Sequence, residues 1–156
     1  MATLILICGL PGSGKTTTAK QLEFSRSALR LCPDEWIASI IADVTDSDEL
    51  DRLRTPVELV QWEIAKRALV LGVNVILENG FWSQEERTRY RTQAESLGAA
   101  VELIYLSVNR DELWARLSKR NENLQPGVFF VREEQLDLWL SWFEPPTADE
   151  IKSYSP

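Results

Sequence analysis

The sequence predicts an α/β fold in which a central parallel sheet carries helices on both faces. Short, continuous apolar runs, of the kind that form buried parallel strands, recur along the chain. Helical segments separate these runs, and this alternation requires crossover connections between parallel strands. With 156 residues, of which 44% are hydrophobic and 26% charged, the chain has the size and composition of one globular domain.

The apolar runs are the candidate strands. TLILIC lies near the start of the chain, ALRLC follows after a helical segment, and NVILE and AVELIYL come later. Continuous aliphatic runs of this length fit strands that are buried on both faces. We expect strands at residues 3–8, 28–32, 74–78 and 100–106.

The helices between the strands have start and stop signals. Thr55 and Glu58 form a capping box with Pro56 at the first helical position, and Gly72 supplies the stop. We expect one face of this helix to be buried, made of Val57, Val60, Ile64, Ala68 and Leu71. Helices are expected at residues 15–24, 34–42, 56–71, 84–97, 111–120 and 132–142.

Three segments carry no strong signal for a helix or a strand. The acidic stretch 43–54 is expected to be a solvated connection. Residues 121–130 contain a Gln-Pro-Gly turn and are expected to form a mobile loop. The final residues, 144–156, are expected to be irregular or to form one short strand.

Composition limits the classes of chemistry and partner. The chain has 24 Asp and Glu residues against 17 Lys and Arg, a net charge of −7, which argues against non-specific nucleic-acid binding. It has no histidine, so histidine-based nucleophile systems and HExxH zinc sites are excluded. Cys8 and Cys32 are expected to be buried thiols in a reducing compartment. Without an apolar run of membrane-spanning length or a signal peptide, we expect a cytoplasmic protein that does not enter a membrane.

Directly after the first predicted strand comes GLPGSGKTTT, which fits the pattern G-x-x-x-x-G-K-[ST] between a strand and a helix. Glycines let the backbone turn so that successive N–H groups point inward, and the helix N-terminus adds a positive partial charge. The lysine of this pattern reaches the β- and γ-phosphates of a nucleotide, and the hydroxyl that follows it ligates Mg²⁺. The motif predicts that ATP and Mg²⁺ bind through Gly9, Pro11, Gly12, Ser13, Gly14, Lys15, Thr16 and Thr17.

A switch GTPase would also carry an N/T-K-x-D element, and none of the lysines has such neighbours. The small size favours a phosphoryl-transfer enzyme in which ATP and its acceptor share one cleft. Such an enzyme needs a base for the acceptor hydroxyl, a carboxylate near Mg²⁺ and cations on the transferred group. In an open parallel sheet the cleft lies at the carboxyl ends of the strands.

Two carboxylates follow predicted strands. Asp34 comes just after the second strand at a helix start, so it is either the general base or a plain N-cap. Glu78 ends the third strand, where it holds a Mg²⁺-bound water or has no metal role. Phe81 and Trp82, which follow it, form either an aromatic wall for a substrate ring or part of the core. Together with Glu35, the two carboxylates favour a neutral or cationic acceptor.

The helix predicted at 111–120 supplies candidate cations. Arg116 and Arg120 lie four residues apart and therefore on one face. Arg120 also lies beside the inward apolar residues Leu113 and Leu117, where the helix meets the loop. Both arginines are candidates to close over the γ-phosphate, the alternative being cations placed favourably near a helix C-terminus.

With these residues in place, the chain resembles the small P-loop kinases of the AAA_33 type, related to the kinase domain of phage-type 5′-polynucleotide kinases. The matching segments are GLPGSGKTTTAK, PDEW, NVILENGFW, LWARLSKRN and FEPP. The resemblance implies a P-loop NTPase fold: a three-layer sandwich with a central parallel sheet and an adenylate-kinase-like lid at about residues 116–131. It also implies that Asp34 is the catalytic aspartate and Arg120 the lid arginine. Polynucleotide kinases of this type have an arginine three residues after the aspartate, and this chain has Ile37 there.

The sequence therefore predicts a single kinase domain over residues 1–156 that transfers the γ-phosphoryl group of ATP to a hydroxyl of a small molecule. Lys15, Asp34, Arg120 and Arg116 are its expected catalytic residues, and Thr16 and Glu78 its expected metal site. The alternatives are a polynucleotide 5′-hydroxyl kinase or a nucleoside or nucleotide kinase, with nucleic acid disfavoured by Ile37 and the net charge, and a regulatory nucleotide-binding ATPase without a dedicated acceptor. The sequence does not indicate an oligomeric state.

Overall fold

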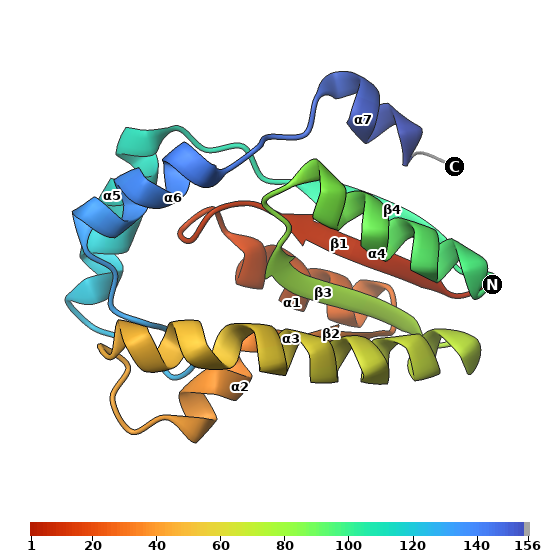
Figure 1. Ribbon diagram of the computed structural model, residues 1–156, viewed down its shortest axis with the longest axis horizontal. Helices are drawn as coiled ribbons and strands as arrows, with labels where there is room; N and C mark the ends of the chain where they lie inside the picture. The colour runs from red at the N-terminus through yellow and green to blue at the C-terminus, as the bar shows by residue number, and fades with distance from the viewer. Residues whose placement is uncertain (155–156) are drawn as a thin grey trace.

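The computed structural model describes residues 1–154 as alternating strands and helices (Figure 1). The first β/α units follow the order expected from the sequence, and two more helices follow the last of them. No helix among residues 1–154 is long and apolar enough to cross a membrane. The elements are β1 (Thr3–Cys8), α1 (Lys15–Ser25), β2 (Ala28–Leu31), α2 (Pro33–Ile40), α3 (Ser47–Val70), β3 (Asn74–Gly80), α4 (Gln84–Ser96), β4 (Ala100–Tyr105), α5 (Arg110–Asn121), α6 (Glu133–Trp142) and α7 (Ala148–Ser153).

The sheet has four parallel strands in the order β2-β3-β1-β4. The predicted strands are confirmed, with β3 extending two residues further, to Gly80. Strand β1 lies at the centre, where Leu4 pairs with Val75 of β3 and with Val101 of β4. Its last residue, Cys8, pairs with Gly80, so the chain leaves β1 beside the carboxyl end of β3.

Helices cover both faces of the sheet, as predicted. On one face α3, α4 and α7 pack on the strands, with Trp62, Tyr90 and Tyr154 in the core cluster. On the other face α1 packs through Ala19 and Leu22 against Ile5 and other residues of the sheet. The inward residues of β1 are fully buried, which is why the run TLILIC is apolar at almost every position.

Helices α5 and α6 form a separate unit at the carboxyl end of the sheet (Figure 1). Leu10, in the loop after β1, packs there with Leu113 and Leu117 of α5 and Leu136 of α6. The expected turn at Gln125 is present, because Val128 N–H donates to its carbonyl at 3.2 Å. This unit includes the predicted lid segment, and it brings the end of α5 close to the loop after β1.

Helix α3 differs from the prediction at its start. The stretch 43–54 is not a solvated connection throughout, because α3 begins at Ser47 and its N-cap Asp46 accepts a hydrogen bond from Glu49 N–H. Pro56 lies inside the helix, where it lacks only the one N–H that would bond to the carbonyl of Arg52. The long helix thus extends past the sheet toward α2.

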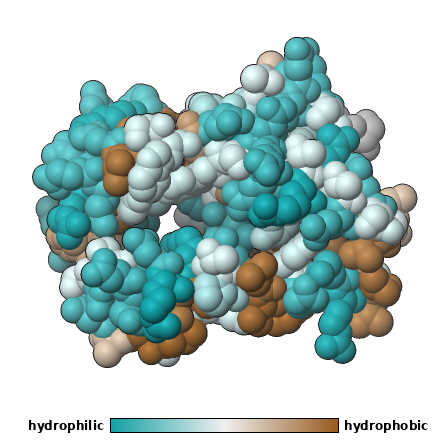
Figure 2. Space-filling model, in the orientation of Figure 1, coloured by the Kyte–Doolittle hydropathy of each residue, from teal (hydrophilic) through white to brown (hydrophobic). Residues whose placement is uncertain are grey.

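The buried face of α3 also differs from the prediction. Val57 is buried, but Val60, Ile64 and Leu71 are 53%, 38% and 80% exposed. Gln61, Trp62, Ala65 and Leu69 occupy the inward face instead. The exposed apolar residues of α3 are part of the brown surface along the lower edge of Figure 2. The error arises because the true stripe contains a glutamine, which breaks an apolar pattern.

The end of the chain forms a helix rather than a strand or an irregular segment. Helix α7 begins after the N-cap Thr147, whose hydroxyl accepts a hydrogen bond from Glu150 N–H. The part of the prediction that concerns residues 155–156 lies outside the described residues.

A buried arginine fastens this last segment to the sheet. Arg87 of α4 is fully buried, and its guanidinium pairs with both carboxylate oxygens of Glu150 at 2.6 and 2.9 Å. The same group donates to the carbonyls of Phe81 and Glu144 at 2.8 and 2.9 Å. Phe81 has a φ of 51°, in the left-handed region that a bulky residue seldom adopts. Arg87 therefore holds together α4, α7 and the turn after β3.

We predict that Arg87→Ala lowers the free energy of unfolding by about 3–5 kcal/mol, because it leaves the buried carboxylate of Glu150 without its ion-pair partner and removes the hydrogen bonds to two carbonyls. Urea unfolding followed by tryptophan fluorescence measures the change. Arg89→Ala, an exposed position on the same helix, is the matched control and should change stability by less than about 0.5 kcal/mol. A loss below about 1 kcal/mol for Arg87→Ala would contradict the assigned anchoring role.

Candidate nucleotide-binding and phosphoryl-transfer site

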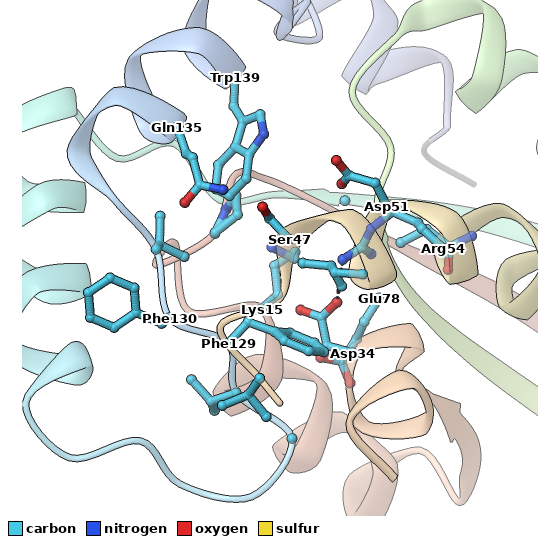
Figure 3. A pocket seen from close by; sticks show the side chains of 18 of the residues that line it. Lys15, Asp34, Ser47, Asp51, Arg54, Glu78, Phe129, Phe130, Gln135 and Trp139 are labelled. Atoms are coloured by element: carbon cyan, nitrogen blue, oxygen red, sulfur yellow. Dashed lines mark hydrogen bonds and ion pairs between the residues drawn. The ribbon is translucent and has the colours of Figure 1, made fainter. Parts of the chain in front are cut away.

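A cavity of about 370 Å³ lies at the carboxyl end of the sheet, between α3 and the α5–α6 unit. Figure 2 shows the molecule hollowed at this place, and Figure 3 shows the side chains that surround it. The loop after β1, the start of α2, the end of β3 and the first half of α3 all contribute to its lining. Sequence-predicted residues that line it are Pro11, Lys15, Thr16, Asp34, Glu78, Trp82 and Arg120.

The loop after β1 is a tight turn that depends on its glycines. A Cβ on Gly9 would lie 2.5 Å from the Ser13 hydroxyl oxygen and 3.3 Å from the carbonyl of Leu106, so a side chain there would require Ser13 to move. Gly14, the N-cap of α1, has a φ of 96°, which favours glycine. Ser13 N–H bonds back to the carbonyl of Leu10 at 3.1 Å. The turn directs the first N–H groups of α1 toward the cavity end of the sheet.

Helix α1 differs from the other helices in the charge of its first turn. Helices α2 to α7 each carry two acidic residues in their first turn, and α1 carries none. Acidic residues there would neutralise the positive end of the helix dipole. The N-terminus of α1 therefore keeps its full partial charge, which suits a phosphate group.

Lys15 is held by its own loop. Its Nζ donates to the carbonyl of Leu10 at 3.1 Å, and it forms no ion pair with a described residue. Burial lowers the pKa of Lys15, while the carboxylates of Asp34 and Glu78 oppose the change. A half-buried ammonium without a carboxylate partner is a binding group for an anion.

The predicted metal residues lie next to each other. The Thr16 hydroxyl donates to Glu78 Oε1 at 2.7 Å, and Arg30 of β2 pairs with Glu78 Oε2 at 2.6 Å. Among residues 1–154 there is no cluster of three acidic or cysteine side chains suited to a metal. A nucleotide-bound Mg²⁺ needs only one or two protein groups, because phosphates and waters complete its shell. The Thr16–Glu78 pair fits such an ion, with Thr16 as ligand and Glu78 as partner of a bound water.

Asp34 faces the cavity from the first turn of α2. The N-cap of this helix is Cys32, and Pro33 occupies its first turn, so Asp34 is not an N-cap. Its Oδ1 instead accepts a hydrogen bond from Arg54 Nη2 at 2.6 Å. Arg54 belongs to α3, and in Figure 3 it lies with Asp51 on the side of the cavity formed by that helix. The contact leaves the second oxygen of Asp34 for another group.

The two candidate arginines of α5 have different surroundings. Arg120 lines the cavity, and its Nε is buried without a hydrogen-bond partner. Burial lowers the pKa of Arg120, which the field of Asp34 partly offsets. Arg116 is 46% exposed, pairs with Glu112, and donates to the carbonyl of Gly12 at 3.3 Å. Arg116 therefore lies over the phosphate loop and outside the lining of the cavity.

Comparison with known proteins identifies the family. The family model AAA_33, described as an AAA domain, matches residues 4–146. The chain belongs to the AAA_33 family. This confirms the resemblance seen in the sequence, and it places the phosphate loop in a nucleotide-binding P-loop family. No curated protein matches the sequence.

Solved structures share the fold of this AAA_33 chain, which is the α/β fold of the P-loop kinases. A candidate kinase from Chloroflexus aurantiacus has a TM-score of 0.73 at 22% identity, over 94% of this chain and 82% of that one. A gluconokinase from Sinorhizobium meliloti has a TM-score of 0.64 at 15% identity, over 97% and 89%. A chain of the Pnkp1/Rnl/Hen1 RNA repair complex has a TM-score of 0.68 at 18% identity, over 99% of this chain and 46% of that one.

The structure shows where several residues of the AAA_33 chain lie whose location the sequence did not determine. Phe81 is fully buried in the core and Trp82 lines the cavity, so only one of the pair contributes to an aromatic wall. Ile37 is fully buried against Val57 and Phe129 and does not reach the cavity. Both cysteines are buried free thiols, and burial raises the pKa of Cys8 to about 11.

The sequence analysis missed the contribution of α3 to the site. Ser47, Asp51, Arg54 and Glu58 are spaced three to four residues apart on one helix face that lines the cavity. The missed signal is Asp46 followed by Glu49, a capping pattern that marks the true start of the helix. Treating the acidic stretch as a connection removed these residues from consideration.

We predict that Lys15→Met weakens the binding of Mg²⁺-ADP or Mg²⁺-ATP by roughly ten- to a hundredfold, because a charge-assisted hydrogen bond to phosphate contributes about 1.5–3 kcal/mol. Isothermal titration calorimetry measures the affinity. Lys20→Met, at an exposed position of the same helix, should bind as the wild type does. Equal affinities of the two variants would show that the loop does not hold the nucleotide through Lys15.

We predict that Glu78→Gln raises the Mg²⁺ concentration needed for half-maximal nucleotide binding by about tenfold, as expected for the loss of a carboxylate that orients a metal shell. Nucleotide titrations at a series of Mg²⁺ concentrations measure this shift without reference to catalysis. Glu23→Gln removes another carboxylate partner of Arg30 and should leave the Mg²⁺ requirement unchanged. A similar Mg²⁺ requirement in both variants would show that Glu78 does not orient the metal shell and acts only as an ion-pair partner of Arg30.

Proposed function

We propose that the chain is an ATP-dependent kinase that transfers the γ-phosphoryl group to a hydroxyl of a small-molecule acceptor. The observation that carries the proposal is that one cavity brings together the phosphate-loop residues Lys15 and Thr16, the carboxylate of Asp34 and the guanidinium of Arg120. These are the cations, the metal ligand and the base that phosphoryl transfer needs.

Each residue has a role that its surroundings support. Lys15 and Arg120 line the cavity and form no ion pair with a residue among 1–154, so both are available to the β- and γ-phosphates. Thr16, with Glu78 behind it, would hold Mg²⁺, and the ion would supply positive charge to the same phosphates. Asp34 has one oxygen held by Arg54, which orients the other toward an acceptor hydroxyl.

The transfer then follows as a single displacement. The free oxygen of Asp34 accepts the proton of the acceptor hydroxyl as the acceptor oxygen bonds to the γ-phosphorus. The bond between the γ-phosphorus and the β,γ-bridging oxygen breaks, and ADP leaves. Arg120 contacts the transferred group from the end of α5, and Arg116 steadies the phosphate loop through the carbonyl of Gly12.

The size of the cavity supports a small acceptor. A volume of about 370 Å³ holds a compound of modest size together with part of the triphosphate. The gluconokinase with the same fold acts, by its name, on a small hydroxyl compound. The chain of the RNA repair complex keeps the polynucleotide alternative open to test.

The experiment is a phosphorylation screen with labelled ATP against small hydroxyl compounds and RNA or DNA ends with a free 5′-hydroxyl. We expect transfer to a small hydroxyl compound. Transfer only to the nucleic-acid ends would assign a polynucleotide kinase. ADP release that no acceptor stimulates would contradict the proposal and assign a regulatory ATPase.

We predict that Asp34→Asn keeps the affinity for ATP and lowers the transfer rate by roughly a hundredfold or more, because the acceptor hydroxyl loses its base. Steady-state rates and calorimetry together separate these two effects. Asp111→Asn changes a carboxylate that is 95% exposed and should have neither effect. Wild-type turnover in Asp34→Asn would remove Asp34 from this role.

A further inference from the structure

The charges that line the cavity are unequal on its two sides. Its cations are Lys15, Arg54 and Arg120, and the first and last are the groups assigned to the phosphates of ATP. Arg54 is the only cation left for the acceptor side among the described lining residues. The lining carboxylates are Asp34, Asp51, Glu58, Glu78 and Glu86.

Arg54 is already committed to carboxylates. It donates to Asp34 at 2.6 Å and lies 3.7 Å from Glu58 on its own helix. Asp51 and Glu86 form no ion pair with a residue among 1–154. Glu35 and Glu78, which sequence analysis counted toward an acidic cleft, are instead neutralised by Arg30. The acceptor side therefore has excess negative charge and no free cation for an anionic acceptor.

Glu58 is the carboxylate most affected by this arrangement. Its side chain is 16% exposed, and burial raises its pKa to about 7. The charged groups that face it are Arg54 of α3, Asp34 of α2 and Glu86 of α4, with the Tyr90 hydroxyl of α4 also within its field. Burial also raises the pKa of Glu86. A cation placed between these two carboxylates would relieve the repulsion and stabilise their charged forms.

Aromatic rings line the same cavity. Trp82 and Trp139 lie with ring centroids 6.0 Å apart, and Phe129, Phe130 and Trp142 complete the aromatic part of the lining. Figure 3 shows Trp139 on the side of α6, with Phe129 and Phe130 in the segment before it. Trp142 and Phe130 are 61% and 41% exposed, so ring surface remains uncovered at the cavity. Tryptophan and phenylalanine faces bind flat apolar groups and organic cations.

Asn79 adds a second acceptor of hydrogen bonds at this place. It lines the cavity from the end of β3, and its amide nitrogen donates to the Tyr90 hydroxyl at 3.3 Å. Its Oδ1 is buried and has no donor among the described residues. An unpartnered amide oxygen in the cavity that Glu58 and Glu86 also line can be satisfied by a ligand that brings N–H or O–H donors.

We propose that the acceptor is an amine-bearing alcohol with a flat apolar body, whose ammonium group lies between Glu58 and Glu86 and whose body stacks on the tryptophans. This inference rests on the proposed function, because it names the acceptor class of the same site. The ammonium supplies the missing cation, the ring covers exposed aromatic surface, and the hydroxyl is directed toward Asp34.

The test compares three probes that share a ring and a benzylic hydroxyl and carry a cationic, a neutral or an anionic para substituent. These are para-(aminomethyl)benzyl alcohol, para-(hydroxymethyl)benzyl alcohol and para-(hydroxymethyl)benzoate. Binding is measured by calorimetry at pH 8 with a non-hydrolysable ATP analogue and Mg²⁺ present. We expect the cation to bind about tenfold more tightly than the neutral probe and the anion to bind most weakly.

The dependence on pH provides a second measurement on the unmodified protein. Between about pH 6 and about pH 8 Glu58 loses its proton while the benzylic ammonium keeps its own, so affinity for the cation should rise with pH. The neutral probe should show no such rise. This measurement needs no variant and therefore does not depend on the folding of one.

Glu58→Gln should reduce the preference for the cation to about threefold or less and remove its dependence on pH. Glu63→Gln, on the same helix with a side chain that is 71% exposed, is the control and should behave as the wild type. Thermal unfolding confirms that both variants are folded. Equal binding of the three probes, tighter binding of the anion, or an unchanged preference in Glu58→Gln would overturn the inference, as would the failure of all three probes to bind.

The outcome can be separated from that of the proposed function. If the cationic probe binds but neither it nor larger amino alcohols are phosphorylated, the preference for an amine-bearing ligand is supported and the kinase function is contradicted. Phosphorylation of neutral or acidic hydroxyl compounds alone would sustain the kinase and contradict the acceptor class. Asp34→Asn should retain binding of the cation while losing transfer, because Asp34 acts on the hydroxyl and Glu58 on the ammonium.

Discussion

The common direction of the four strands is the constraint on which the candidate site depends. Because the strands are parallel, their carboxyl ends meet at one edge of the sheet. The loop after β1, Asp34 after β2 and Glu78 in β3 therefore converge, although each is separated from the next along the chain. An antiparallel neighbour would have carried one of these groups to the opposite edge.

Pairing between charged side chains determines which charged groups of the cavity have no partner. Arg30 holds Glu78 against Thr16, and Arg54 holds Asp34. Each arginine fixes one oxygen of its carboxylate through a hydrogen bond, so the acidic groups are held in a defined orientation. Lys15 and Arg120 are left without carboxylates, and this leaves them to meet the charge of a phosphate. In the proposed mechanism the paired arginines, Arg30 and Arg54, orient carboxylates, and the unpaired Lys15 and Arg120 bind phosphate.

The sequence predicted the sheet and the phosphate loop because both rest on local rules. Apolar runs indicated the strands, and the glycines and Lys15 of the loop carry their geometry within a few residues. The start of α3 was missed because its N-terminal half packs on α2 through Leu50 and Leu53 and not on the sheet, so its residues looked like a polar connection. Its stripe was misplaced because Gln61, although polar, is fully buried. Which face a helix buries is decided by tertiary packing, and periodicity alone did not decide between two candidate faces.

The sequence alone did not reveal that Arg54 lies beside Asp34 in the cavity. The sequence has Ile37 where a related class of kinases has an arginine, and in the fold Ile37 is buried against Val57 and Phe129. A guanidinium nevertheless lies beside Asp34, because Arg54 reaches it from the next helix. Arg54 does not replace the arginine that related kinases have at the position of Ile37, because it already pairs with Asp34 and Glu58. If Asp34 is the base, as proposed, Arg54 in this state orients it and leaves no free cation on the acceptor side, an arrangement that would disfavour anionic acceptors.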